Sequence, residues 1–364
     1  MTMLSALIAA QATVAGPIPL TASHWETDGE VAFETRDGRP VMRLGAAVSG
    51  TRSGAQANIK GLEFATGVVD YDVMLPDAME FSGPIFHQPD GGTAEYIYFR
   101  PHMNGKPDAI QYTPITNGSL NWQIFTGEGF EAAATFPLGR WMHVRVDIYE
   151  SSALVSIDGK PTLAIPDLKN GKLGGGIGFA GLMGGTYYSN ITVEPVAGYK
   201  DPAPKPAVKP LPDGIVATWQ ISEPMTQDDA FARASARRWE GVPWHPIKVE
   251  ANGVANLSKA GPDGDDTHSF IARFALASAK AQAIPMQFGF SDDVRIYVNG
   301  QPLYEGSDRQ GSRDYRFLGH VGLWDTVHLP LKAGANEVTF VVTDPTNGGT
   351  AAAAILPKGF RASL

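Results

Sequence analysis

The sequence predicts an all-β protein with two domains joined by a proline-rich linker. The length of 364 residues suits two domains at roughly 100–200 residues each. The 41 glycines and 27 prolines favour short strands and turns over long helices. Short runs of alternating apolar and polar residues recur along the chain, often around Asp-Gly or Asn-Gly turns. Prolines at 202, 204, 206, 210 and 212 disfavour both helix and central strand, which marks the linker at residues 197–214.

The N-terminus carries an apolar run from Met3 to Ala10, followed by small residues up to Gly16. No Lys or Arg precedes the run, although Thr13 to Ala15 resembles a signal-peptidase cleavage site. We expect a signal peptide over residues 1–16 and a periplasmic or extracellular protein; the alternative is a short apolar strand. The run is shorter than the ~20 residues that cross a bilayer, so we expect no membrane span.

Residues 17–196 are predicted to form the first domain. The turns Asp37-Gly38 and Asp158-Gly159 lie between alternating runs and indicate hairpins. In another predicted strand, Asp70 and Asp72 are two residues apart, so both side chains point to one face. They could form a catalytic or calcium-binding pair, or they could be part of a solvated surface. The expected strands cover residues 31–34, 41–44, 67–74, 96–99, 109–112, 122–125, 141–149, 154–157, 162–165, 177–180 and 187–193.

One segment of this domain, residues 95–123, interleaves aromatic rings with hydrogen-bonding side chains. Sugars offer C–H faces to aromatic rings and hydroxyls to amides, carboxylates and guanidinium groups, so the segment predicts a glycan site. If its strand continues through Pro101, alternation puts Ile97 and Phe99 toward the core. The opposite face then carries Tyr96, Tyr98, Arg100 and His102. Following strands add Gln111, Tyr112, Trp122 and Gln123 as predicted ligand-binding residues.

Acid–base catalysis near the same surface is an alternative to sugar binding alone. The sequence contains no G-x-S-x-G motif of a serine hydrolase. A two-carboxylate mechanism needs a particular separation of the carboxyl groups, which sequence cannot establish. The catalytic candidates are Glu95, His102, Asp108 and Glu128.

Several motifs of the first domain resemble the second half of a laminin-G-like or concanavalin A-like jelly roll, and the resemblance covers about residues 20–196. The resemblance rests on Trp-x-His-Val-x-Val at 141–146, Asp-Gly at 158–159, Gly-Ile-Gly-Phe at 176–179 and residues 188–193. That fold hosts lectins, adhesion modules, glycoside hydrolases and polysaccharide lyases, so it does not choose among them. The Glu-x-Asp-x-x-Glu strand of its glucanase branch is missing. The pattern of the branch acting on 3-keto-glycosides is not clearly matched, so no catalytic residue is carried over.

Residues 215–364 are predicted to form the second domain. Thr226 with Asp229 resembles a capping box and predicts a short helix up to Arg237. Strands are expected at residues 270–276, 284–290, 294–298, 326–331 and 337–343, with a hairpin turn at Asn299-Gly300. Residues 288–300 together with 328–338 resemble the galactose-binding-like jelly roll, over about residues 215–350. This second resemblance implies a β-sandwich fold without implying a ligand.

Cofactor and partner classes are narrowed by composition. The chain has no cysteine, and its eight histidines show no His-x-His or His-Glu-x-x-His spacing. Gly176 to Gly181 matches G-x-G-x-x-G but precedes another strand, so no organic cofactor is expected.

The net charge of −9 and the absence of a basic stripe argue against nucleic acid as a partner. Structural Ca²⁺ is the metal considered, on Asp263, Asp265 and Asp266 in a glycine-rich loop, whose alternative is a polar surface loop.

Three functions remain open from the sequence. The favoured one is a secreted or periplasmic protein that binds a poly- or oligosaccharide on the first sandwich. The second is a glycoside hydrolase or polysaccharide lyase that uses carboxylates or His102 near the same surface. The third is a structural or adhesion module whose aromatic residues bury a domain interface.

Overall fold

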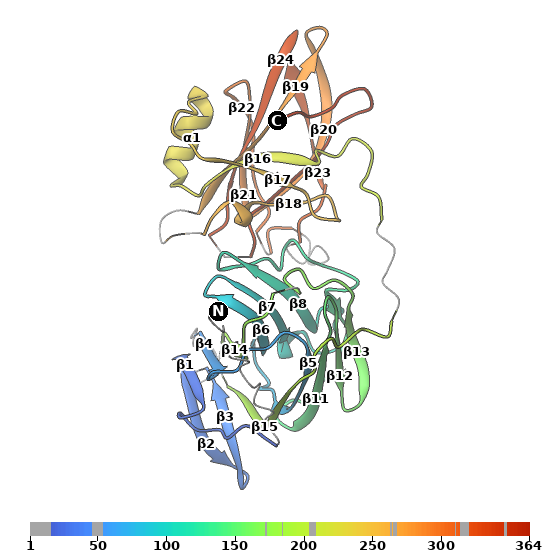
Figure 1. Cartoon of the computed structure of the whole chain (residues 1–364). Helices are drawn as coiled ribbons and strands as arrows, with labels where there is room; N and C mark the ends of the chain where they lie inside the picture. Colours follow the sequence, from blue (N-terminus) through green and yellow to red (C-terminus); the bar gives the residue numbers. More distant parts are fainter. Residues whose placement is uncertain are drawn as a thin grey trace, which may run out of the picture. The chain divides into compact units, whose positions relative to one another are not determined.

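The computed structural model describes residues 16–45, 54–171, 173–183, 185–203, 209–262, 264, 268–309, 311–313, 320–345 and 348–364. Within these residues the strands form four sheets, accompanied by one α-helix and two short 3-10 helices, which confirms the all-β sandwich class (Figure 1). The chain divides into two compact units. Unit 1 comprises Met1–His87, Ile97–Gln111 and Glu131–Pro204, and unit 2 comprises Gln88–Tyr96, Tyr112–Phe130 and Lys205–Leu364.

Two sheets come from the first half of the chain. The larger runs β1 (Trp25–Gly29), β4 (Ala55–Ile59), β14 (Gly176–Gly181), β6 (Ser82–Asp90), β7 (Thr93–Phe99), β8 (Ile110–Thr116) and β10 (Glu131–Ala132), with β9 (Ser119–Leu120) beside β8. The other runs β13 (Lys160–Ile165), β12 (Ala153–Ile157), β11 (Trp141–Ile148), β5 (Gly67–Met74), β15 (Thr186–Pro195), β3 (Arg39–Leu44) and β2 (Val31–Arg36).

Aromatic side chains pack between these two sheets. Phe179 on β14 contacts Tyr71 on β5, with ring centroids 5.0 Å apart at 80°, and Tyr188 on β15 at 4.7 Å. All three side chains are buried. Edge-to-face pairs of this kind contribute about 0.5–1.5 kcal/mol beyond the area they bury. These buried rings on β5, β14 and β15 therefore join the two sheets into a sandwich.

The predicted hairpin turns are present. Asp37-Gly38 connects β2 to β3, and Asp158-Gly159 connects β12 to β13. Both residues of each pair have positive φ, 51° and 76° in the first turn and 47° and 75° in the second. Such angles suit the right-handed twist of hairpin strands, and Asp-Gly adopts them at low steric cost.

Two sequence predictions in the segment 95–123 were wrong about secondary structure. The strand does not continue through Pro101: β7 ends at Phe99, and Pro101–Met103 forms the 3-10 helix η1. Proline lacks the N–H that a strand ladder needs, and its fixed φ suits the first position of a helix. Residues 122–125 form a turn where a strand was expected.

The second half of the chain supplies the other two sheets. One runs β17 (Trp244–Lys248), β16 (Thr218–Ser222), β19 (Ser269–Ser278), β24 (Gly334–Thr343), β21 (Asp293–Val298) and β22 (Gln301–Ser307). The other runs β18 (Ala255–Asn256), β25 (Ala351–Ile355), β20 (Gln282–Ser291) and β23 (Asp325–Leu331), with η2 (Leu257–Ala260) following β18. Helix α1 (Gln227–Ala236) begins as predicted, because the Thr226 side chain accepts a hydrogen bond from the Asp229 N–H at 3.3 Å.

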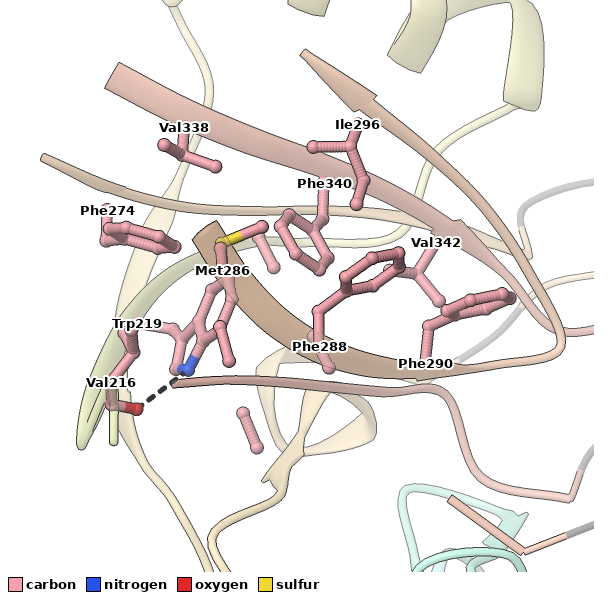
Figure 2. Close-up of a cluster of buried hydrophobic side chains, with 14 of the residues drawn as sticks. Val216, Trp219, Phe274, Met286, Phe288, Phe290, Ile296, Val338, Phe340 and Val342 are labelled. Atoms are coloured by element: carbon pink, nitrogen blue, oxygen red, sulfur yellow. Dashed lines mark hydrogen bonds between the residues drawn. The ribbon is translucent and has the colours of Figure 1, made fainter. Parts of the chain in front are cut away.

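The core of unit 2 lies between its two sheets and includes Trp219 (Figure 2). The Trp219 ring contacts Phe274 at 5.0 Å and Phe340 at 5.2 Å, both edge-on. Its indole N–H donates to the Val216 carbonyl at 3.0 Å, the dashed contact in Figure 2. A buried indole needs such a partner, so this bond fixes the ring orientation.

The segment Tyr112–Phe130 belongs to unit 2 although its neighbours in sequence form part of unit 1. Asn117 donates to the Ser258 carbonyl at 2.7 Å, and Gln123 donates to Asp292 at 2.8 Å. Ile124 and Phe125 are buried against a small apolar cluster that includes Val254, Ala351 and Ala353. This segment is therefore anchored by hydrogen bonds and by apolar burial.

Several sequence predictions fall on residues that the structure does not describe. They are the signal peptide up to residue 15, the central linker residues 204–208 and the calcium candidates Asp263, Asp265 and Asp266. The described linker residues on either side, 197–203 and 209–214, contain no helix or strand. In the described part of the chain, no helix is long and apolar enough to cross a membrane. No group of three His, Asp or Glu side chains there is placed to hold a metal ion.

Candidate functional site

A cluster of polar and aromatic side chains lies in unit 1 where β7 ends and β8 begins. We call it the Arg100 cluster. Its members come from the residue before β6, from β7, from η1 and the residue that caps it, from the turn before β8, and from β8 and β10. They are Phe81, Tyr98, Arg100, His102, Asp108, Gln111 and Glu131.

Arg100 and Asp108 form the centre of this cluster. Their side chains are 6% and 1% exposed, and Arg100 Nη1 donates to Asp108 Oδ2 and, at 3.3 Å, to the Asp108 carbonyl. The backbone brings them together, because the Arg100 N–H donates to the Ala109 carbonyl at 2.8 Å. Asn104 steadies the intervening turn by exchanging two hydrogen bonds with the Phe136 backbone, at 3.1 and 2.7 Å. Removing one partner of such a buried pair costs about 3–5 kcal/mol.

A chain of hydrogen bonds runs beside the ion pair. Tyr98 donates its hydroxyl proton to Gln111 Oε1 at 2.8 Å, and Gln111 Nε2 donates to Glu131 Oε1 at 2.5 Å. Glu131 reaches this position because β10 pairs with β8 in the register that sets Glu131 opposite Gln111. Burial raises the pKa of the Tyr98 phenol; Arg100 lowers it in part, and Glu131 and Asp108 raise it further. Tyr98 is therefore a neutral donor, and both carboxylates act on it.

Phe81 supplies an aromatic surface to the cluster. Its ring centroid lies 5.0 Å from the His102 ring and 6.0 Å from the Tyr98 ring, and the Arg100 guanidinium lies 5.7 Å from it. The ring is half-buried. Met79, two residues before Phe81 in the chain, is 50% exposed. Leu182, whose N–H donates to the Phe81 carbonyl at 3.1 Å, is 38% exposed. Two exposed apolar residues are therefore linked to Phe81 through the backbone.

His102 is half-buried on η1. Burial lowers the pKa of its imidazole to about 4, the positive charge of Arg100 contributes to the lowering, and Asp108 opposes it. At neutral pH His102 is therefore uncharged, with one ring nitrogen as a donor and the other as an acceptor. A neutral imidazole can bind a hydroxyl group in either role.

Three neighbouring members of the cluster carry a buried polar atom that has no hydrogen-bond partner among the described residues. These atoms are Arg100 Nε, His102 Nδ1 and Asp108 Oδ1. A buried polar atom without a partner costs about 1–3 kcal/mol, so most such atoms in proteins have one. These three atoms have almost no accessible surface, so they belong to the polar interior behind the half-buried rings of Phe81 and His102.

The remaining predicted site residues belong to unit 2. Tyr112 donates to Glu95 Oε2 at 2.7 Å and stacks on Phe130 with centroids 5.9 Å apart. Gln123 is buried in its contact with Asp292, and Trp122 lies so close to Gly348 that a Cβ there would come within 2.9 Å of its indole nitrogen. Tyr96 is buried, and Glu128 is exposed. A ligand-binding role for Tyr96, Tyr112, Trp122 and Gln123, like a catalytic role for Glu95 and Glu128, stays a prediction.

Sequence reasoning missed Phe81 and Glu131. Glu131 lies 20 residues beyond Gln111, across the segment Tyr112–Phe130 that belongs to unit 2. Phe81 follows Met79 and Glu80 just before a strand, a pattern that looks like ordinary strand entry. The pairing of β10 with β8 is what brings Glu131 beside Gln111. This pairing cannot be read from the sequence.

The acidic pair Asp70 and Asp72 has a different environment in unit 1. His143 lies between them, 3.2 Å from each carboxylate, and Arg145 and Arg39 add contacts of 3.2 Å to Asp70 and Asp72 respectively. His143 is exposed and the carboxylates are partly exposed. The pair is thus part of a surface ladder of alternating charges on β5 and β11, as the solvated-surface interpretation predicts.

Comparison with known proteins identifies distant similarity. No model of a known protein family matches the chain. A segment of 136 residues, 34% of this chain, is 24% identical to the rhizobactin receptor of Rhizobium meliloti (strain 1021); it spans 18% of that receptor, well under two thirds of its length.

Solved structures that resemble the chain cover about half of it. A protein of unknown function with a galectin-like fold from Bacillus subtilis is 12% identical, covering 50% of this chain and 96% of its own, with a TM-score of 0.38. The carbohydrate-binding module CBM66 from Bacillus subtilis is 15% identical, covering 48% and 99%, with a TM-score of 0.36. A prokaryotic β-1,3-1,4-glucanase from a mouse hindgut metagenome is 14% identical, covering 50% and 98%, with a TM-score of 0.35. At these similarities the function has to be argued from the Arg100 cluster itself.

Proposed function

We propose that this protein binds a poly- or oligosaccharide and that the Arg100 cluster is the binding site. The observation that carries the proposal is the contact of two half-buried rings, Phe81 and His102, whose centroids are 5.0 Å apart. The Arg100 guanidinium lies 5.7 Å from the Phe81 ring, so charged groups adjoin this aromatic surface.

The chemistry of the cluster suits a sugar better than an apolar or a strongly charged ligand. An apolar ligand would leave the neutral imidazole of His102 without a hydrogen-bond partner. A sugar ring instead offers a hydroxyl group to His102 and a C–H face to Phe81.

Catalysis is a second candidate, favoured by one observation. Two carboxylates, Asp108 and Glu131, both act on Tyr98, and the neutral His102 lies beside Arg100. A glycoside hydrolase or lyase needs such acid–base groups. Recognition is preferred because Asp108 is engaged by Arg100 and Glu131 by Gln111, so both carboxylates already serve the architecture of the site.

A glycan array followed by calorimetry tests the proposal. We expect the wild-type protein to bind a saccharide and His102→Ala to bind it about fivefold more weakly, since one hydrogen bond is worth about 1 kcal/mol. Trp324→Ala is the control, because Trp324 is 48% exposed and belongs to unit 2. Equal affinity of wild type and His102→Ala would remove the Arg100 cluster from the site.

Turnover of the same saccharide separates the two candidates. We expect no release of shortened products by the wild-type protein. Product release that Glu131→Gln abolishes while leaving binding intact would establish the catalytic alternative. The proposed periplasmic or extracellular location is tested separately, by fractionating cells that express the full chain.

A further inference from the structure

A cavity of about 500 Å³ in unit 2 is separate from the Arg100 cluster, because every residue that lines it belongs to unit 2. Its walls come from helix α1, from β21, β22 and β24, and from Arg309, two positions beyond the end of β22. Sites for small ligands typically measure about 300–1,000 Å³. The cavity is therefore large enough for a small ligand, and its lining side chains determine which kind.

The strand register brings lining side chains into two neighbouring rows. Asp293 on β21 lies opposite Ser307 on β22 and Thr343 on β24. Arg295, two residues further along β21, lies opposite Glu305. Paired residues of antiparallel strands point to the same face, and positions two apart in a strand are about 6–7 Å apart. All five side chains line the cavity, so one ligand can contact both rows.

Two ion pairs lie along these rows and leave accessible groups. Arg295 donates through Nε and Nη2 to Glu305 Oε2, at 3.0 and 2.7 Å. Arg309 donates through Nε to the Asp293 carboxylate at 3.1 and 3.2 Å, and its Nη2 contacts the same carboxylate. The Glu305 and Arg309 side chains are 67% and 51% exposed. Within the described part of the chain these bonds leave Glu305 Oε1 as an accessible acceptor and Arg309 Nη1 as an accessible donor.

Helix α1 supplies another wall of the cavity. The Arg295 guanidinium lies 3.9 Å from the centroid of the Phe231 ring, a cation–π contact that holds it in place. Phe231 is half-buried, so part of its apolar surface stays accessible. Gln227 is exposed and donates to Thr343 Oγ1 at 3.2 Å, which leaves its amide oxygen as a further acceptor. The cavity thus combines apolar ring surface with positioned donors and acceptors.

The charges of the cavity cancel. Two arginines and two acidic residues line it, each arginine paired with one carboxylate. A charged ligand would be attracted by one member of each pair and repelled by the other. An apolar ligand would cover Glu305 and Arg309 without replacing their hydrogen bonds to water. A neutral ligand with several hydroxyl groups suits both residues, because a hydroxyl can donate or accept.

We infer that this cavity is a second saccharide-binding site, which takes a neutral sugar. One hydroxyl of the sugar accepts from Arg309, another donates to Glu305, and C–H groups pack on Phe231. The inference rests on the proposed function for the class of ligand, while its residues lie in the other unit of the chain. The protein thereby carries two separate saccharide sites, one in each unit.

Calorimetric titration of the full chain with neutral oligosaccharides identified on a glycan array tests this inference. Arg309→Ala removes the accessible donor. Ser307→Leu places a larger apolar side chain in the cavity and leaves both ion pairs in place. Arg238→Ala is the matched control, because Arg238 is an exposed arginine of unit 2 that does not line the cavity.

We expect at least one neutral oligosaccharide to bind about tenfold more weakly to Arg309→Ala and to Ser307→Leu than to the wild type. A tenfold change corresponds to about 1.4 kcal/mol, the scale of one hydrogen bond to a charged group. Arg238→Ala should bind the same oligosaccharide as tightly as the wild type does.

The outcomes distinguish this site from the Arg100 cluster. Saccharide binding that His102→Ala weakens, while Arg309→Ala and Ser307→Leu leave every affinity unchanged, would overturn the second site and support the proposed function. The reverse result would support the second site and remove the Arg100 cluster. Tighter binding of a polyuronate that Arg309→Ala abolishes would overturn the neutral ligand. Binding of no saccharide at all would overturn both proposals.

Discussion

Arg100 and Asp108 form a buried ion pair that links the end of β7 to the turn before β8. The contact joins Arg100 Nη1 to Asp108 Oδ2, and Arg100 Nη1 also donates to the Asp108 carbonyl at 3.3 Å. The pair therefore supports the fold of the turn that carries His102, and its loss should act on stability.

The structural role of the pair predicts that removing one partner costs more stability than removing both. Asp108→Ala leaves the Arg100 charge buried without its partner and should lower the free energy of unfolding by about 3–5 kcal/mol. The double variant Arg100→Met with Asp108→Leu removes both charges and should cost less, because apolar groups of similar size often replace such pairs at little cost. Urea unfolding of the wild type and the two variants measures this. A double variant less stable than Asp108→Ala would contradict it.

The aromatic role of Phe81 predicts a selective loss of affinity. Phe81→Ala removes the ring that contacts His102 and Arg100, and saccharide affinity should fall about tenfold, since an aromatic contact contributes about 0.5–1.5 kcal/mol beyond area burial. Phe81→Leu keeps most of the apolar volume and serves as the matched variant. Calorimetric titration should rank the proteins as wild type, Phe81→Leu, Phe81→Ala. The opposite order of the two variants would show that the flat ring is not what the ligand uses.

The lowered pKa of His102 predicts a pH dependence of stability. Its folded pKa of about 4 lies below the ordinary value of about 6.5, so between these pH values the unfolded chain binds more protons. The stabilisation is present above pH ~6.5 and is lost as the pH falls toward 4. After allowance for the partial exposure of His102, the loss should be about 2 kcal/mol.

His102→Gln isolates this contribution, which matters because burial also lowers the pKa of His87. Unfolding free energies measured at pH 7 and pH 4.5 should differ less in His102→Gln than in the wild type. An identical difference in the two proteins would mean that His102 does not titrate as described.

Gly83 on β6 predicts a steric effect in the sheet that carries the site. A Cβ at this position would lie 2.1 Å from the Ile97 carbonyl oxygen of β7, which is backbone and cannot move aside. Gly83→Ala should therefore destabilise unit 1 by about 1–3 kcal/mol, as overpacking typically does. Gly54→Ala is the control, since a Cβ there would meet no atom within 4 Å. Thermal unfolding that treats the two variants alike would contradict the close approach of β6 and β7.

The Arg100 cluster was partly predictable from sequence. Tyr98, Arg100, His102, Asp108 and Gln111 lie within 14 residues of one another, and their polar and aromatic character is visible in the chain. The expected geometry was wrong at Pro101, where a 3-10 helix replaces the strand. His102 nevertheless lies beside Phe81. The 3-10 helix η1 places it there, whereas the prediction relied on the alternation of side chains along a strand.

Features that depend on neighbouring residues could be predicted from the chain alone: the all-β class, the Asp37-Gly38 and Asp158-Gly159 turns, and the Thr226 cap of α1. These follow from local backbone preferences and side-chain periodicity. Which distant residues meet depends instead on the tertiary fold. It brought Glu131 to Gln111 through strand pairing, and it placed the segment Tyr112–Phe130 in unit 2. It also left Arg100 Nε and Asp108 Oδ1 buried without partners, because burial and hydrogen-bond satisfaction belong to the packed chain as a whole.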